Sequence, residues 1–413
     1  MAYNLILWWA MLFLRLYFRR TIVIGREHIP PEGPLIVASN HPSAFMEASV
    51  LATVLGRQLH FLVRGDVFNP RFRWLFRWTN QIPIYRQKDG ISNLRKNASS
   101  FDLTYQRLAD GHAVLIFPEA KTTLEKKMRP IQRGTAHLAF GTLPSMPEGK
   151  KLLVLPVGVN FMEPRIPGTD IVVRFGQPFM TPEATREDRD AIEQFTETLS
   201  DAMSPLILQV HEHGYEKHFD VLASVYLKII ERGKSNMAIH DDLKRIEDLV
   251  NAHEKHKDIL SEVHDYIHQL KKHGAAEAIY YPNMVRTNRL LLAVLLLLKL
   301  IWLMAGGWIW RGMRYFIFSK LRTDTFQGPT SVGAAMVLFP LLSFVLLLLA
   351  WILAWPLWLV PAWLSFLALG KMIPFPLNLI WKLLVLRASL KKSLDHKIRD
   401  FTKAIRNMTG QPV

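Results

Sequence analysis

The sequence predicts an α/β fold with a mixed sheet flanked by helices, followed by a helical arm and a C-terminal α-helical membrane region. Three observations predict it. Up to about residue 209, short aliphatic and β-branched runs alternate with polar stretches, which is typical of strands alternating with helices. Residues 210–285 are mostly polar and contain few Gly or Pro, as expected of helices. Beyond residue 286, apolar runs reach the length of a bilayer span.

The composition limits the class of partner. The chain has 413 residues, and 51 Lys and Arg against 35 Asp and Glu give it a net charge of +16, which implies an anionic partner. A hydrophobic fraction of 50%, concentrated in long runs, favours the membrane surface over nucleic acid. The chain contains no cysteine, which excludes thiol nucleophiles, disulfides and thiolate metal sites and fits a reducing compartment.

The first predicted element is a membrane-associated helix within residues 1–20. Residues 4–17 are rich in Trp, Leu and Phe, and Arg19 and Arg20 follow them. The run is too short to span a bilayer comfortably, and no small-residue cleavage site follows it. We therefore expect an uncleaved helix lying in or dipping into the bilayer, with a buried core helix as the alternative.

Residues 21–209 are expected to form the catalytic domain around a mixed sheet. Several of its apolar runs have the character of strands buried on both faces, and ligands are expected where such strands end and helices begin. The predicted strands are 21–24, 35–38, 59–63, 113–117, 152–157 and 171–175.

Residues 210–285 are expected to form a polar helical arm, as hairpins or a brace. Many histidines occur here, and we interpret them as residues of solvated helix faces. No metal site is predicted, because no carboxylate-histidine pattern of the zincin type accompanies them.

Residues 286–413 are expected to form membrane-embedded helices with a basic C-terminal tail. The run 290–310 is long enough to cross a bilayer at about 1.5 Å per residue. The run 332–369, interrupted by Pro340 and two later prolines, suits two spans or a re-entrant hairpin, and a weaker apolar run covers 373–386.

Positive charge predicts the orientation of this region. The segments 311–322 and 387–406 are both basic, so the positive-inside rule places both in the cytoplasm. We expect a membrane protein with its catalytic domain on the cytoplasmic face, while the number and direction of the spans stay open.

The candidate catalytic residues follow the end of the predicted strand 35–38. This strand delivers His41 to the start of a helix, beside the free backbone N–H groups of its first turn. Glu47 is placed to hold one ring nitrogen, which leaves the other as a base able to take a proton from a hydroxyl. Because the chain has no G-x-S-x-G nucleophile, the predicted nucleophile is a substrate hydroxyl and the predicted reaction is transfer.

Four short segments occur in the order and rough spacing of known motifs: NHPSAFME at 40–47, IPIYR at 82–86, FPEAKT at 117–122 and LPVG at 155–158. As a set they resemble the four motifs of the glycerolphosphate and lysophosphatidate acyltransferase family, over about residues 21–179. The resemblance implies that family's α/β fold and a membrane-bound O-acyltransferase of phospholipid synthesis. Its acyl donor would be acyl-CoA or acyl carrier protein, with membrane lipid as the surroundings, and no metal or other cofactor is implied.

The resemblance also implies an acceptor and a set of catalytic roles. The acceptor would be a phosphorylated glycerol or lysophospholipid, namely glycerol-3-phosphate or 1-acylglycerol-3-phosphate. His41 would be the general base, oriented by Glu47. Arg86 would bind the acceptor phosphate, which suits the planar fork of a guanidinium. Backbone N–H groups near the helix start are the expected oxyanion donors.

The remaining motif residues are expected to shape the substrate site. Glu119 would position the glycerol part together with the adjoining backbone, and Lys121 and Thr122 would lie beside it. Pro156 would shape the apolar wall for the acyl chain. Arg64 is a further cation near the motifs, which would join the phosphate site or meet lipid headgroups.

Two residues depart from the family pattern. The family's acid is mostly an Asp with four residues between it and the histidine, whereas here it is Glu47 with five. Ala120 stands where the third motif usually has Gly, and it would cost about 1 kcal/mol if the turn needs a positive φ. Two alternatives are therefore an acyltransferase for another lyso-lipid, such as a lyso-aminolipid, and a non-catalytic lipid-binding membrane scaffold.

Overall fold

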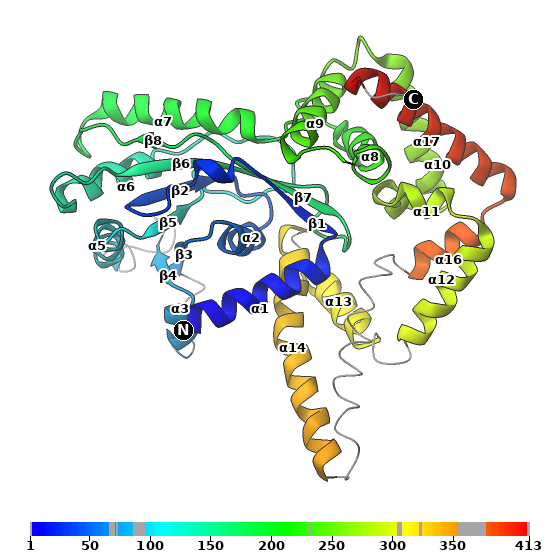
Figure 1. Ribbon diagram of the computed structural model, residues 1–413, viewed down its shortest axis with the longest axis horizontal. Helices are drawn as coiled ribbons and strands as arrows, with labels where there is room; N and C mark the ends of the chain where they lie inside the picture. The colour runs from blue at the N-terminus through cyan, green and yellow to red at the C-terminus, as the bar shows by residue number, and fades with distance from the viewer. Residues whose placement is uncertain are drawn as a thin grey trace.

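The structure, a computed structural model, describes residues 2–65, 71, 73–85, 96–231, 233–303, 308–321, 324–352 and 377–410. Figure 1 shows a sheet with helices on both faces, a helical body beside it, and one long helix that extends away from both. Two hydrophobic clusters lie on the two faces of the sheet, and a third fills the helical body.

The described residues form one mixed sheet of eight strands in the order β1-β7-β6-β2-β5-β3-β4, with β8 beside β6. Neighbouring strands from β6 to β4 are parallel, whereas β6 runs antiparallel to β7 and β8. This confirms the predicted mixed sheet. The strands are β1 Arg20–Ile24, β2 Leu35–Ser39, β3 Leu59–Arg64, β4 Gln81–Ile84, β5 Ala113–Ile116, β6 Leu153–Phe161, β7 Asp170–Phe175 and β8 Phe179–Met180.

The register of the central strands positions the site. Ala38 of β2 lies opposite Ile116 of β5 and Pro156 of β6. Because these three strands are parallel, their carboxyl ends reach the same edge of the sheet. The loops that follow β2 and β5 therefore meet, and these loops carry His41 and Glu119.

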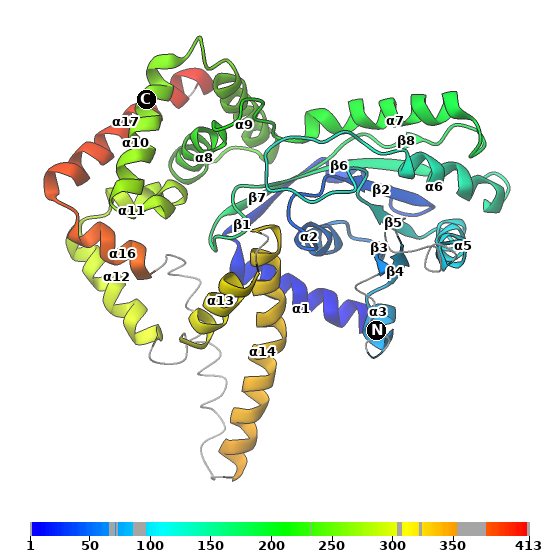
Figure 2. The same cartoon turned by 180° about the vertical axis from the view of Figure 1, so that it is seen from behind.

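Helices cover both faces of the sheet (Figure 2), and every residue of the central strand β2 is therefore buried. Leu35 and Val37 pack toward α1, α2 and α14 (Asp324–Ile352), while Ile36 and Ala38 pack toward α5, α6 and α7. The helices of this part are α1 Ala2–Tyr17, α2 Met46–Val54, α3 Arg73–Trp78, α5 Lys96–Ala109, α6 Gly134–Thr142 and α7 Arg189–Met203. Short 3₁₀ turns are Arg26–His28, Leu143–Ser145 and Ser204–Leu206.

Two strands contain a proline where its missing N–H removes no ladder hydrogen bond. Pro83 lies in β4, which is the edge strand, the usual place for a proline in a sheet. Pro156 lies between the segment of β6 that pairs with β7 and the segment that pairs with β8. The sequence did not predict β4 as a strand, because four residues with a central proline do not give a strand pattern.

The helical body packs against the β1 side of the sheet and buries its own apolar core (Figures 1 and 2). The Asn236 amide joins the two parts by donating to the Val23 carbonyl at 3.0 Å. The helices of the body are α8 Glu216–Val225, α9 Asn236–Asn251, α10 Lys257–Lys272, α11 Pro282–Arg286, α12 Arg289–Trp302, α16 Leu377–Val385 and α17 Ala388–Thr409. A π-helical turn, Tyr226–Ile230, follows α8, and a 3₁₀ turn, Ala276–Tyr280, precedes α11.

The basic segment 387–406, expected as a tail, is a packed helix. Most of it lies in α17, whose Leu394, Ile398, Phe401 and Ile405 are buried in the core of the helical body. These four residues recur at spacings of four, three and four, which places them on one face of a helix. The many charges of the segment lie on the other faces and conceal this apolar stripe when charge alone is counted.

Among the described residues, one helix is long and apolar enough to cross a membrane, over Asp324–Val345. It belongs to α14, Asp324–Ile352, which also contains Pro329 and Pro340, so the break expected at Pro340 does not occur. The run 290–310, expected as one span, contains α12 and the start of α13, Trp308–Lys320, and its residues 304–307 lie outside the described residues. Most of the second half of the run 332–369 also lies outside them.

Candidate active site

Asn40 fixes the loop that leaves β2. Its side-chain amide donates to the Val159 carbonyl at 3.0 Å, and its side-chain oxygen accepts from the Val159 backbone N–H at 2.7 Å. The side chain thus continues the β2–β6 ladder one residue past the end of the strand. As a consequence, His41 leaves the sheet from a fixed point.

Glu47 holds the His41 ring. Its side-chain Oε1 is hydrogen-bonded to Nδ1 of His41, and Oε2 accepts from the Ser43 backbone N–H at 3.2 Å. Glu47 lies in the first turn of α2, so one helical turn after the loop brings its carboxylate back to the ring. Burial raises the pKa of the Glu47 carboxyl, and the hydrogen bond and charge of His41 oppose this effect.

The His41 side chain is 19% exposed, whereas that of Glu47 is 0% exposed. A substrate can therefore reach the imidazole and not the carboxylate. The ring also stacks on Phe117, with centroids 4.1 Å apart and planes 12° apart. Because Glu47 occupies Nδ1 and Phe117 fixes the plane of the ring, Nε2 is the nitrogen left for proton transfer.

Glu119 lies in the loop after β5, next to the His41 loop. The two loops are joined by a hydrogen bond from the Thr123 backbone N–H to the His41 carbonyl, 3.3 Å long. Glu119 is 5% exposed, and its Oε1 has no hydrogen-bond partner among the residues that the structure describes. Burial raises the pKa of the Glu119 carboxyl. Hydrogen bonds from the Arg129 and His41 backbones, and the charges of these two residues, act in the opposite direction.

The turn after Glu119 has a positive φ. Ala120 has a φ of 54°, and its backbone N–H donates to the Phe117 carbonyl at 3.1 Å. A residue with a Cβ is strained in this region, at a cost of about 1 kcal/mol. Ala120 therefore carries the strain that a glycine would avoid.

The structure describes four of the other predicted site residues. Lys121 is exposed, Thr122 is half-buried, and Pro156 is buried in β6 opposite Ala38. Arg64 ends β3 and lies opposite Ile84 of β4. Arg86 lies outside the described residues, two positions beyond Ile84.

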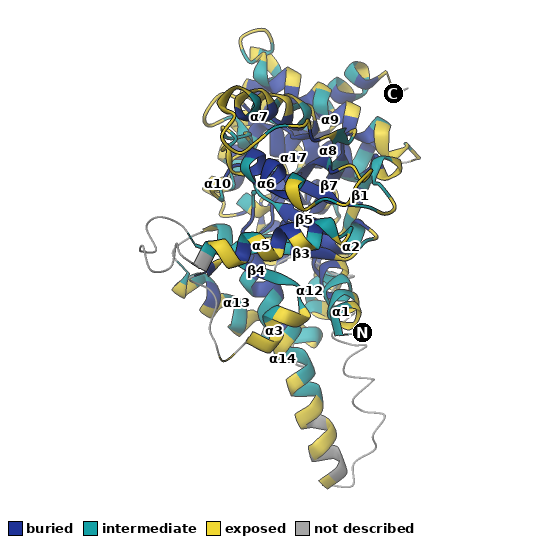
Figure 3. Cartoon of the chain, turned by 90° about the vertical axis from the view of Figure 1, so that its left-hand side faces the viewer, coloured by how far each residue is buried: buried dark blue, intermediate teal, exposed yellow. Residues whose placement is uncertain are grey.

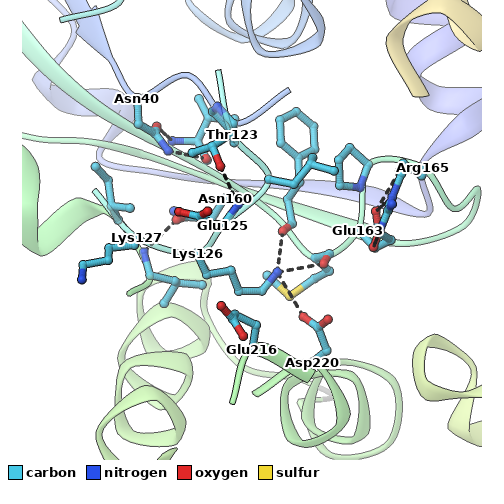
Figure 4. A pocket seen from close by; sticks show the side chains of 18 of the residues that line it. Asn40, Thr123, Glu125, Lys126, Lys127, Asn160, Glu163, Arg165, Glu216 and Asp220 are labelled. Atoms are coloured by element: carbon cyan, nitrogen blue, oxygen red, sulfur yellow. Dashed lines mark hydrogen bonds and ion pairs between the residues drawn. The ribbon is translucent and has the colours of Figure 1, made fainter. Parts of the chain in front are cut away.

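A cavity of about 280 Å³ opens beside these loops, and the sequence did not predict it. Its lining includes Asn40, Pro42 and Glu119 of the loops, and Glu216, Lys217 and Asp220 of the helical body. Figure 4 shows Asn40 on one side, and Glu216 and Asp220 on the other. Asn40, Pro42 and Glu119 belong to the motifs and so gave a sequence signal. The residues of the helical body lie far beyond the last motif, which ends at residue 158, and no spacing pattern connects them to the motifs.

A network of charged side chains holds this cavity together. Figure 4 shows the Lys126 ammonium between the Phe161 and Met162 carbonyls, at 3.3 and 3.0 Å, and Asp220, at 3.0 Å. Lys217 contacts the same Asp220 at 2.9 Å and Glu163 at 3.6 Å.

Glu163 is, with Asp220, a buried acid of this network. Burial alone would raise the pKa of Glu163, but the hydrogen bonds and charge of Arg165, with Lys217 and Lys126, lower it to about 2. Arg165 contacts Glu163 at 2.8 Å and Asp324 of α14 at 2.7 Å. Among the described residues, no group of three or more His, Asp or Glu is arranged to hold a metal ion.

Residues 20–160, which contain the His41 loop, β5 and most of β6, match the family model described as Acyltransferase. The chain therefore carries an acyltransferase-family domain. Within that class, relatives named as a 1-acyl-sn-glycerol-3-phosphate acyltransferase and a glycerol-3-phosphate O-acyltransferase are among the proteins to which the chain is similar.

Two curated relatives show the extent of this similarity. An uncharacterized acyltransferase of Schizosaccharomyces pombe is 22% identical over 302 residues, covering 51% of this chain and 45% of the relative. A 1-acyl-sn-glycerol-3-phosphate acyltransferase of Chlamydomonas reinhardtii is 31% identical over 159 residues, covering 35% and 46%. The chain thus spans less than half the length of these relatives.

Among solved structures, the 1-acyl-sn-glycerophosphate acyltransferase of Thermotoga maritima is similar to 48% of this chain. The similarity covers 78% of that protein, with 18% sequence identity and a TM-score of 0.35.

Proposed function

We propose that this protein is a membrane-bound O-acyltransferase. It moves a fatty acyl group from acyl-CoA or acyl carrier protein to a hydroxyl of glycerol-3-phosphate or 1-acylglycerol-3-phosphate. The observation that carries the proposal is the pair His41 and Glu47, in which a buried carboxylate holds one nitrogen of a solvent-accessible imidazole. The family of residues 20–160 supports the reaction class.

In the proposed reaction, Nε2 of His41 takes the proton of the acceptor hydroxyl as the oxygen attacks the thioester carbonyl carbon. A C–O bond forms, the C–S bond breaks, and His41 returns the proton to the leaving thiolate. Backbone N–H groups at the start of α2 are the proposed donors to the oxyanion. Glu47 stays ionised and keeps the ring in one tautomer throughout.

The remaining motif residues are proposed to bind substrate. Arg86 binds the acceptor phosphate, with Arg64 as a further cation on the neighbouring strand. Glu119 positions the glycerol part, beside Lys121 and Thr122. Pro156, a rigid residue in β6, shapes the wall along the acyl chain.

Exposed apolar side chains support the membrane part of the proposal. Figure 3 shows that exposed residues run along α14, and Figure 1 places α1, α3 and α14 on the same side of the sheet. Large hydrophobic side chains exposed on these helices include Leu5, Trp8, Trp74, Trp78, Val337 and Phe344. We propose that this side meets the bilayer, with the catalytic domain on its cytoplasmic face.

An acyl-transfer assay tests the proposal. The purified full-length protein is given both thioester carriers and both acceptors, and the product lipid is identified by mass spectrometry. We expect transfer that falls by at least about 100-fold in His41→Ala, the contribution expected of a general base. His268→Ala, at an exposed histidine of α10 in the helical body, is the matched control and should retain activity. Near-normal transfer by a folded His41→Ala protein would show that the assignment of the base is wrong.

A further inference from the structure

The cavity beside the active-site loops is formed by both parts of the molecule. Asn40 and Pro42, on either side of His41, belong to its lining, as do Glu216 and Asp220 of α8 (Figure 4). Its volume of about 280 Å³ is near the lower end for small-molecule sites, of about 300–1,000 Å³. The cavity therefore suits the headgroup of a lipid and is too small for a whole lipid.

The side chains that line the cavity have a net negative charge, whereas the chain as a whole has a net positive charge. Five carboxylates contribute to the lining, against four cationic side chains, in a protein whose net charge is +16. The carboxylates are Glu119, Glu125, Glu163, Glu216 and Asp220, and the cations are Lys126, Lys127, Arg165 and Lys217. A local excess of negative charge favours a cationic occupant.

Three of the four cations already use their donors within the protein. Lys126 is held by two carbonyls and Asp220, and Lys217 by Asp220, Glu163 and the Tyr280 hydroxyl. Arg165 is held by Glu163 and Asp324. A phosphate in the cavity would have to compete with these carboxylates and carbonyls for the donors that they already hold.

Glu119, in contrast, keeps an acceptor that the described part of the protein does not use. It is 5% exposed, and its Oε1 has no hydrogen-bond partner among the described residues. Glu216 is 27% exposed; its Oε2 accepts from the Gly214 backbone N–H at 3.0 Å, and its Oε1 lies 3.9 Å from Nδ1 of the exposed His213. A buried carboxylate oxygen without a partner is costly, and a ligand that donates hydrogen bonds removes this cost.

We infer that this cavity binds the ammonium group of a phosphorylated lyso-lipid headgroup, so that the protein also acylates an ammonium-bearing lysophospholipid. The inference rests on the proposed function, because His41 and the transfer reaction are the same. An ammonium offers three N–H donors and one positive charge, which match the unused Oε1 of Glu119 and the negative charge of Glu216. While protonated it has no lone pair, so the hydroxyl remains the group that is acylated.

Two acceptors that differ in one group test the inference on the wild-type protein. They are 1-acylglycerol-3-phosphoethanolamine and 1-acylglycerol-3-phosphopropanol, in which a methyl group replaces the ammonium. Both are presented in mixed micelles to the purified full-length protein, and kcat/KM for acyl transfer is measured. We expect a preference of about tenfold for the ammonium acceptor, which corresponds to about 1.4 kcal/mol.

A pair of variants locates the preference in the cavity. Glu216→Gln removes one lining charge at a half-buried position, and we expect the preference to fall to about threefold or less. Glu212→Gln, on the exposed loop before α8 and outside the lining, should keep the full preference. Thermal melting of both variants shows whether they are folded.

The outcomes separate the two ideas. Transfer to 1-acylglycerol-3-phosphate without a preference for the ammonium acceptor would overturn the inference and leave the proposed function standing. Equal effects of Glu216→Gln and Glu212→Gln would also overturn it. A preference for 1-acylglycerol-3-phosphoglycerol over both other headgroups would show a polyol site instead. No transfer to any acceptor would overturn the proposed function and the inference with it.

Discussion

Two buried carboxylates, Glu47 in the acyltransferase-family domain and Glu163 at the contact with the helical body, have opposite electrostatic surroundings. Glu47 faces the imidazole of His41, and burial raises the pKa of the Glu47 carboxyl. Glu163 faces Arg165 and Lys217, which are permanently charged at neutral pH, and its pKa is lowered to about 2. A carboxylate bonded to an accessible imidazole suits proton transfer, whereas one between fixed cations suits stability.

The largest effect is expected from a substitution of Glu47, which should reduce the rate of acyl transfer. Glu47→Gln keeps the size of the side chain and removes the charge that stabilises a protonated His41 ring. We expect acyl transfer to fall by about 10²- to 10⁴-fold, measured as kcat, while the melting temperature changes little. Glu193→Gln, on the exposed face of α7, is the control. A Gln variant as active as the wild type would remove Glu47 from the mechanism.

The second largest effect is expected from a substitution of Glu163, which should reduce the free energy of unfolding. Its folded pKa of about 2 lies below the ordinary 4.5, so its ionised form stabilises the fold by about 3 kcal/mol at neutral pH. Because the folded pKa is the lower one, this stabilisation is complete above about pH 4.5 and is lost as the pH falls toward 2. We expect Glu163→Gln to lower the free energy of unfolding by about this amount at pH 7, measured by denaturant titration.

The pH dependence provides the check on Glu163. The difference in stability between wild type and Glu163→Gln should shrink steadily as the pH is lowered from 4.5. The exposed Glu183→Gln is the matched control and should follow the wild type at every pH. A constant difference across this range would contradict the electrostatic origin of the effect.

The smallest expected effect concerns the backbone of the active-site loop. Ala120→Gly removes the strain of the positive φ, and we expect it to stabilise the protein by about 0.5–1 kcal/mol. The same substitution at Ala136, inside α6, should destabilise the protein by about 1 kcal/mol. Thermal melting of the two variants compares them directly, and shifts of the same sign would show that Ala120 is not strained.

The sequence predicted the features that are formed by residues close together in the chain. The buried strands had continuous apolar runs, and the spacing of His41 and Glu47 spans one loop and one helical turn, so both appeared in the sequence. The longer Glu47 side chain, which departs from the family's usual Asp, still reaches the ring because α2 begins at Met46.

The parts that depend on distant residues left no such pattern. Lys126 and Asp220 meet only because the helical body packs against the end of β6, and no periodicity records a contact between residues 94 positions apart. The apolar face of α17 was concealed for a related reason, since its partners lie on α8, α9, α10 and α11. Charge density alone predicted a tail where the fold places a core helix.

The two outer strands of the sheet have a consequence for the solubility of the chain. An open strand edge offers unpaired N–H and C=O groups to strands of other molecules and promotes aggregation. Pro83 interrupts the donors of β4 at one edge, and the helical body covers β1 at the other, where Asn236 occupies the Val23 carbonyl. A shortened protein that ends near residue 209 would keep the active-site loops and expose β1 as an edge for self-association.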